Sequence, residues 1–228
     1  MFQAIYDSPW HNPASFWAAA LAFLAVWMRK KPFLVAFFAL FGVEILADAL
    51  ATGGWSPLSF HKSPLTTPIA IAFVILGDFR YFLLVERFAR RPAIQPAEAT
   101  SANAWASSAA LSFVVPVLGA AANRALPARF SDTRWTFLTY EVIFFFFALA
   151  LRFLVLPRRL DAVPAAVRAW LLAVTDFEIA QYALWAVSDV IILAGADAGF
   201  ALRLVPDFMY YAFFLPFVAW KAPAEVDP

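Results

Sequence analysis

Cysteine is absent from the 228 residues of this sequence. Its absence excludes disulfide bonds, thiolate metal ligands and cysteine nucleophiles. Histidine is almost as scarce, because His11 and His61 are the only two, too few for a three-histidine zinc site. The motifs H-E-x-x-H and G-x-S-x-G and a glycine-rich phosphate loop are also absent. We therefore expect a protein without a bound metal ion or cofactor.

Charged residues are few as well. They make up 14% of the chain against 64% for hydrophobic residues, whereas soluble domains carry about 25% charged and about 45–50% apolar residues. With a mean hydropathy of +0.74, lipid rather than water must cover much of the surface. A net charge of +1, with the basic residues in short clusters, excludes nucleic acid as a partner. We expect membrane lipid as the partner and, from the compact, alanine-rich chain, a bacterial inner membrane as the location; the oligomeric state stays open.

Long apolar runs bounded by charge or proline recur along the chain. A helix that crosses the hydrocarbon core of a bilayer requires about 20 residues, and the sequence contains seven runs of comparable length. It thus predicts an all-α fold, a single transmembrane helical domain over residues 1–228 that forms a polytopic bundle of about seven helices. The predicted helices cover residues 13–28, 32–50, 66–88, 104–122, 135–156, 167–194 and 198–220.

Basic residues predict the orientation of this bundle, since cytoplasmic loops of membrane proteins carry an excess of Lys and Arg. Eleven of them fall on the side of the C-terminus and five on the opposite side. The N-terminus is therefore predicted to lie outside the cell and the C-terminus in the cytoplasm.

A faint internal repeat relates two of the predicted helices. Residues 78–82 read D-F-R-Y-F and residues 207–211 read D-F-M-Y-Y. The predicted helices 32–50 and 167–194 carry Asp48 and Asp189 near their outer ends. This pattern fits a 3+1+3 arrangement, in which two parallel three-helix units flank a central helix, as in some transporters.

Carboxylates inside the predicted helices are the main functional signal. An ionisable group at the bilayer centre costs at least about 2.5–3.5 kcal/mol on insertion scales, so such groups face the bundle interior. Arg80 is the only base well inside a predicted helix, and it cannot neutralise all the acids. Some acids must therefore be protonated, bind a cation or face water, which predicts a polar cavity that opens outward above Asp78 and Arg80. The acids are Glu44, Asp48, Asp78, Glu141, Glu178, Asp189 and Asp207.

Helical spacing places tyrosines beside several of these acids. Tyr182 lies one turn after Glu178, and Asp189 continues the same stripe. A similar face of the last predicted helix carries an acid and two tyrosines. We predict that substrate binds to the inward-facing residues Asp207, Tyr210, Tyr211, Glu178, Tyr182, Glu44, Arg80 and Glu141.

Two short segments, Leu76-Gly77-Asp78 and Val187-Ser188-Asp189-Val190, resemble the membrane-embedded Gly-Asp and Ser-Asp of the lysoplasmalogenase-like family of polytopic membrane proteins. The resemblance implies that Asp78 and Asp189 form the catalytic pair of a lipid-directed hydrolase. Such an enzyme splits the vinyl-ether bond of a lysoplasmalogen into an aldehyde and a glycerophospho head group. The family usually has eight helices, where this sequence predicts seven.

The chemistry of that reaction suits two buried carboxyl groups. Vinyl-ether hydrolysis begins with protonation of a carbon atom, which requires a positioned acid. A carboxyl group kept protonated by apolar surroundings can supply the proton. A second carboxylate would activate water or stabilise the oxocarbenium-like cation.

Two other functions fit the same sequence. A proton- or cation-coupled carrier of a small solute fits the repeat and the acids at matching positions in its halves. A membrane scaffold or subunit, in which buried acids only join helices, fits the short loops. Loss of turnover in Asp78→Asn or Asp189→Asn would favour the hydrolase, and solute uptake that a protonophore abolishes would favour the carrier.

Overall fold

The computed structural model describes residues 1–8, 20, 32–52, 63–89, 97–127, 130 and 133–226. Within these residues the regular structure is entirely helical. The predicted helix 13–28 and both histidines, His11 and His61, lie outside the described residues.

Helices cover the other six predicted runs. A short helix, α1 (Phe2–Tyr6), precedes them. Four runs form single helices, namely α3 (Pro32–Thr52), α4 (Thr66–Ala89), α5 (Ala97–Ala125) and α8 (Ala165–Leu193). The other two are divided by a π-helical turn: α6 (Thr133–Ala150), η4 (Leu151–Val155) and α7 (Leu156–Arg159) follow directly on one another, as do α9 (Ala198–Phe208), η5 (Met209–Phe213) and α10 (Phe214–Lys221). A 3₁₀ turn, η6 (Ala224–Val226), ends the described chain.

Among the residues that the structure describes, five helical segments are long and apolar enough to cross a membrane, as in a multi-pass membrane protein. They are Phe33–Thr52, Thr67–Ala89, Ala102–Ala125, Thr133–Arg159 and Ala198–Lys221. Helix α8, with 29 residues, is about 43 Å long at 1.5 Å per residue. It exceeds the roughly 30 Å of a bilayer core, but it carries Asp176, Glu178 and Asp189 and is not among the five.

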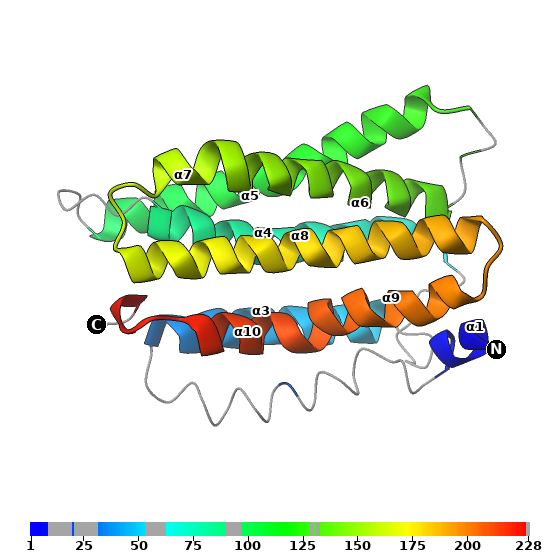
Figure 1. Ribbon diagram of the computed structural model, residues 1–228, viewed down its shortest axis with the longest axis horizontal. Helices are drawn as coiled ribbons and strands as arrows, with labels where there is room; N and C mark the ends of the chain where they lie inside the picture. The colour runs from blue at the N-terminus through cyan, green and yellow to red at the C-terminus, as the bar shows by residue number, and fades with distance from the viewer. Residues whose placement is uncertain are drawn as a thin grey trace.

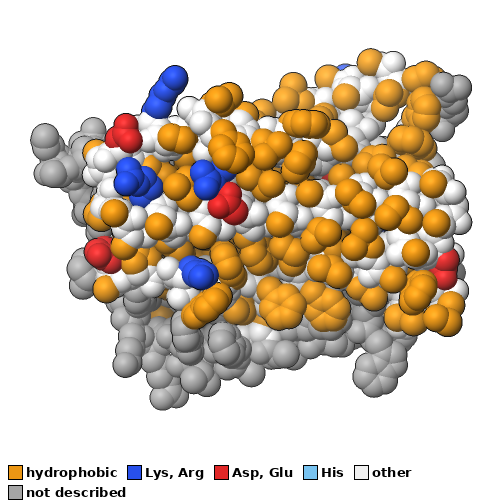
Figure 2. All heavy atoms as spheres, viewed as in Figure 1, with side chains coloured by type: hydrophobic (Ala, Val, Ile, Leu, Met, Phe, Trp, Pro, Cys, Tyr) orange, Lys and Arg blue, Asp and Glu red, His pale blue; other side chains and the backbone are white. Residues whose placement is uncertain are grey.

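The long helices lie side by side along the longest axis of the molecule, and α8 occupies a central place (Figure 1). It contacts α4, α6, α9 and α10, while α5 packs on α4 and α6, and α3 packs on α4. The C-terminus lies at one end of the bundle, and α1 lies at the other, beside the start of α9. The face seen in Figure 2 is mostly hydrophobic, as a lipid-facing surface requires, and most of its Lys and Arg side chains lie in the half with the C-terminus.

Aromatic rings form much of the core. Phe38, Phe82, Phe144 and Phe214 are each at most 1% exposed. The ring of Phe144 stacks on Tyr182 with the centroids 3.9 Å apart. Such rings fill the spaces between helices and hold α6 and α8 in register.

The carboxylate of Asp197, just before α9, anchors α1. It accepts hydrogen bonds from the amino group of Met1 (2.8 Å) and from the backbone amides of Gln3 (2.8 Å) and Phe2 (2.7 Å). These hydrogen bonds, led by the one from the amino group, lower the pKa of Asp197 to about 2. The Tyr6 ring lies 5.6 Å from that of Phe200, so α1 is fixed to the α8–α9 connection.

Gly199 offers a test of the close approach between α8 and α9. A Cβ atom there would lie 2.6 Å from Cγ1 of Ile192 and 2.8 Å from the backbone oxygen of Ser188. We expect Gly199→Ala to lower the free energy of unfolding in detergent by about 1–3 kcal/mol, because backbone cannot yield as a side chain does. The control is Gly119→Ala, since a Cβ atom at Gly119 meets nothing within 4 Å. Equal stability of the two variants would contradict this packing.

Candidate functional site

Asp78 lies in the middle of α4 and is 2% exposed. Its Oδ1 accepts a hydrogen bond from the hydroxyl of Tyr182 on α8 (2.5 Å), and its Oδ2 accepts one from the hydroxyl of Tyr140 on α6. Three helices therefore meet at one carboxyl group. Because both oxygens are bound, the orientation of this acid is well defined.

Arg80 is fully buried next to this acid, but it is held by aromatic rings. Its guanidinium lies 4.2 Å from the ring centroid of Tyr210 and 4.4 Å from that of Phe214. Nη2 donates a hydrogen bond to the carbonyl oxygen of Tyr210 (3.2 Å). Gly77 makes room for the same ring, because a Cβ atom there would lie 2.6 Å from Cε2 of Tyr210. The Gly-Asp pair in the sequence thus has a packing role as well as a chemical one.

Glu44 on α3 and Glu178 on α8 complete this central group. Both are buried, and their carboxylates and that of Asp78 feel the positive charge of Arg80. Both oxygens of Glu44, Oε1 of Glu178, and Nε and Nη1 of Arg80 have no hydrogen-bond partner among the described residues. An unpaired buried polar atom costs about 1–3 kcal/mol. Several such atoms together make this group the candidate functional site.

A second polar group lies nearer the end of the bundle that carries α1. Oδ1 of Asp189 on α8 accepts hydrogen bonds from Nη1 of Arg134 (2.6 Å) and from Nη1 of Arg203 on α9. The same Arg203 nitrogen lies 3.2 Å from Oε1 of Glu141 on α6, and its Nε donates to the hydroxyl of Tyr6 (3.2 Å). Charge-assisted bonds of this kind are strong, so this group ties α1, α6, α8 and α9 together.

The residues 207–211 do not all contact the same helix. Oδ1 of Asp207 accepts a hydrogen bond from Nε1 of Trp185 on α8 (2.6 Å). The Tyr211 hydroxyl donates to Oδ2 of Asp48 on α3 (3.0 Å). The Tyr210 hydroxyl donates to a carbonyl oxygen of α4. The π-helical turn η5 begins directly after α9, so the shared face that regular helical spacing predicts is divided among three neighbouring helices.

Asp78 and Asp189 bind different partners at different depths. Tyr182, which holds Asp78, and Asp189 are seven residues apart on α8, about 10 Å along the helix axis. Glu178, in contrast, is only four residues from Tyr182, one turn of α8. Along α8, Glu178 is therefore closer than Asp189 to the residue that binds Asp78.

Sequence reasoning missed three members of the site, Tyr140, Arg134 and Arg203. Both arginines lie near the ends of predicted helices, so the sequence pattern groups them with the loops rather than with the bundle interior. The spacing of Arg203 does indicate its place, because it precedes Asp207 by one helical turn and so lies on the same face of the helix. Tyr140 directly precedes Glu141, so it joins the central group to the second one.

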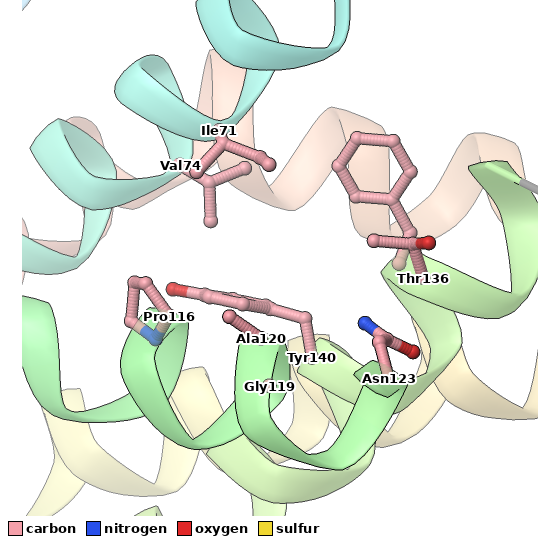
Figure 3. A pocket seen from close by; sticks show the side chains of 9 residues that line it. Ile71, Val74, Pro116, Gly119, Ala120, Asn123, Thr136 and Tyr140 are labelled. Carbon is pink, nitrogen blue, oxygen red and sulfur yellow. The ribbon is translucent and has the colours of Figure 1, made fainter. Parts of the chain in front are cut away.

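An apolar cavity of about 210 Å³ lies between α4, α5 and α6 (Figure 3). Ile71 and Val74 line it from α4, and Pro116, Gly119 and Ala120 line it from α5. Its few polar side chains include those of Asn123 and Thr136.

Tyr140 connects this cavity to the buried acid. Its ring forms part of the cavity wall and lies near Pro116 and Ala120 in Figure 3. Its hydroxyl is bound to Asp78. A molecule in the cavity would therefore be one tyrosine ring away from the central carboxyl group.

No family model matches this chain, and no curated protein or solved structure matches it either. In the part of the chain that the structure describes, no group of three or more His, Cys, Asp or Glu side chains is arranged to hold a metal ion. The function has to be argued from the site itself.

The ion pairs of Arg203 are expected to stabilise the fold. Arg203→Gln leaves Glu141 without its cation, and Asp189 with one instead of two. We expect a loss of about 3–5 kcal/mol in the free energy of unfolding, as for other broken buried ion pairs. Chemical unfolding in detergent measures it.

Arg152→Gln is the matched control for this variant. Its partner Asp176 has a side chain that is 53% exposed, so loss of Arg152 leaves no acid buried among the helices, and we expect a smaller loss of stability than for Arg203→Gln. Losses of the same size in the Arg203 and Arg152 variants would show that the buried pairs do not stabilise the bundle.

Proposed function

We propose that this multi-pass membrane protein is a lipid-directed hydrolase, in which Asp78 gives a proton to an apolar, lipid-like substrate. The observation that carries the proposal is the double role of Tyr140, which lines the apolar cavity and binds Asp78. The resemblance of Leu76-Gly77-Asp78 to the lysoplasmalogenase-like motif adds the reaction, hydrolysis of a vinyl ether.

The cavity suits the substrate of such an enzyme. Its walls are mostly aliphatic and accept a hydrocarbon chain without loss of hydrogen bonds. Asn123 and Thr136 offer polar groups at one side, where the glycerol or head-group oxygens of a lysolipid would lie. Lipid reaches such a site from within the membrane.

Two carboxyl groups divide the proton transfers of the reaction. Asp78 protonates the vinyl carbon, the resulting oxocarbenium-like cation takes up water, and a second carboxylate accepts a proton from that water. The hemiacetal then breaks down into an aldehyde and an alcohol. The resemblance gives the second role to Asp189, but the position on α8 favours Glu178, which lies one turn from Tyr182, the partner of Asp78, whereas two arginines bind Asp189.

The orientation with the C-terminus in the cytoplasm is part of this proposal. Arg158, Arg159, Arg168 and Lys221 lie toward the end of the bundle that carries the C-terminus, as the excess of positive charge on cytoplasmic sides requires. The group around Asp189 would then face the outer half of a bacterial inner membrane.

Aldehyde release from a lysoplasmalogen by the purified protein tests the enzyme. Asp78→Asn should lower turnover by at least about 100-fold, because the amide cannot donate the proton. Tyr140→Phe, which removes one of the two hydrogen bonds on Asp78, should lower it by about tenfold. Asp176→Asn is the control, since its exposed carboxylate pairs with Arg152 away from the site.

Substitution of the two possible second carboxylates separates their roles. Glu178→Gln should abolish turnover, while Asp189→Asn should keep most of it in folded protein. Thermal unfolding of each variant in detergent verifies the fold. Full activity of Asp78→Asn would overturn the hydrolase, and the reverse ranking of the other two would return the second role to Asp189.

The arrangement of the ionisable groups favours a second candidate, a proton-coupled carrier. They extend from Asp189, Arg203 and Glu141 near one end to Asp78 and Glu178 in the middle, and Tyr140 and Glu141 connect the two groups on α6. Chains of buried acids form the proton relays of many transporters.

Proteoliposomes with a trapped pH-sensitive dye test the carrier. With wild-type protein, we expect a candidate solute to cause proton movement across the membrane, whereas Asp78→Asn should show none. No hydrolysis product should form with either protein. A protonophore should abolish the solute accumulation that a pH gradient drives. If no solute changes the movement of protons in either wild-type protein or Asp78→Asn, the carrier proposal is contradicted.

A further inference from the structure

The apolar cavity between α4, α5 and α6 contains a polar atom that the proposed proton transfers do not use. Oδ1 of Asn123 is buried and has no hydrogen-bond partner among the described residues. The hydroxyl of Tyr140, another polar group of the same wall, is already bound to Asp78. Oδ1 of Asn123 therefore remains available to a molecule that enters the cavity.

Asn123 lies where the polar end of an amphiphilic molecule would be placed. It is two residues before the end of the apolar span Ala102–Ala125, and so close to the membrane interface. Pro116, seven residues earlier on α5, lies about 10 Å deeper along the helix axis. Figure 3 shows the carboxamide of Asn123 directed from α5 toward the cavity. The cavity therefore has a polar edge near the interface and an apolar interior.

An unpaired acceptor selects a ligand by the hydrogen-bond donors that the ligand carries. A carboxamide oxygen only accepts hydrogen bonds, so a molecule that pairs with Oδ1 of Asn123 must present an O–H or N–H group. The glycerol of a lysolipid carries such a hydroxyl beside its single chain. In a lipid with two chains this oxygen belongs to an ester and has no hydrogen to donate. Since an unpaired buried acceptor costs free energy, the cavity should distinguish the two lipids.

The size of the cavity favours the same class of lipid. Its volume is about 210 Å³, the share of about seven water molecules at about 30 Å³ each, and a methylene group is similar in size to a water molecule. A section of one alkyl chain is therefore enough to fill it.

We propose that Asn123 is a specificity-determining residue, whose carboxamide oxygen accepts a hydrogen bond from the free glycerol hydroxyl of a lysolipid. This role rests on the proposed function, because it requires a lipid chain in the cavity beside Tyr140. Asn123 takes no part in the proton transfer from Asp78. It selects the lipid that binds, because a lipid whose hydroxyl is acylated or alkylated leaves Oδ1 unpaired.

Two saturated ether lipids test this role without any chemical step. Both carry a 1-O-alkyl chain and a phosphoethanolamine head group, and the second glycerol carbon bears a hydroxyl in one and a methoxy group in the other. Neither contains a vinyl ether, so the proposed hydrolase leaves both intact. Native mass spectrometry with equal amounts of the two compounds measures their relative binding. We expect the hydroxyl compound to bind at least about tenfold more tightly, because the methoxy oxygen cannot donate to Oδ1.

Two variants connect this preference to Asn123. Asn123→Leu keeps the size of the side chain and removes the acceptor, so it should abolish the preference. Asn103→Leu is the matched control, because Asn103 lies on the same helix but is exposed and does not line the cavity; it should keep the preference. Persistence of the preference in Asn123→Leu would overturn the proposal. Equal binding of the two compounds to wild-type protein would also overturn it, and that measurement requires no variant to fold.

Failure of this role and failure of the hydrolase give different results. A preference for the hydroxyl compound without aldehyde release from a lysoplasmalogen would refute the hydrolase and support the lysolipid site at Asn123. Aldehyde release without the preference would refute the role of Asn123 and leave the hydrolase intact.

Discussion

The absence of water from the hydrocarbon core is the constraint on which the rest of the structure depends. A carboxylate there has no solvent to stabilise its charge, so neighbouring helices must supply its partners. Asp189 receives two guanidinium groups, and Asp78 receives two phenol hydroxyls. The helices that carry these partners are α6, α8 and α9. These helices are therefore fixed relative to one another, and the aromatic core fills the space between them.

The two polar groups differ in the chemistry that their partners allow. A carboxylate between two arginines forms charge-assisted hydrogen bonds that hold its helices together. A carboxyl group held by two neutral hydroxyls can exchange a proton without leaving an unpaired cation behind. Anchoring is therefore concentrated near the α1 end of the bundle, and the proposed chemistry near its middle, where Glu178 and Glu44 have oxygens without a partner among the described residues.

Apolar run length predicted α3, α4, α5 and the two helical segments with π turns, because a bilayer demands a minimum length that chance rarely supplies. Desolvation cost likewise predicted that Asp78, Glu178 and Asp189 are buried. The pairing of acids with bases was not predictable. Arg203 lies near a helix end, and only the packing of α9 on α8 shows that its side chain reaches inward to Asp189 and Glu141. The N-terminus-out orientation and the 3+1+3 repeat remain predictions.

The π-helical turn η5 joins α9 and α10 into one span whose two halves differ in their rotation about the helix axis. A π turn contains one more residue than an α turn, so α10 is rotated by about 100° relative to a continuous α-helix. The α9 half thereby directs Arg203 and Asp207 at polar partners, while the α10 half directs Phe214 and Val218 into the apolar core. A one-residue deletion within Met209–Phe213 would restore regular geometry yet misdirect one of the halves. In evolution, this span should tolerate exchanges of residues far better than changes of length.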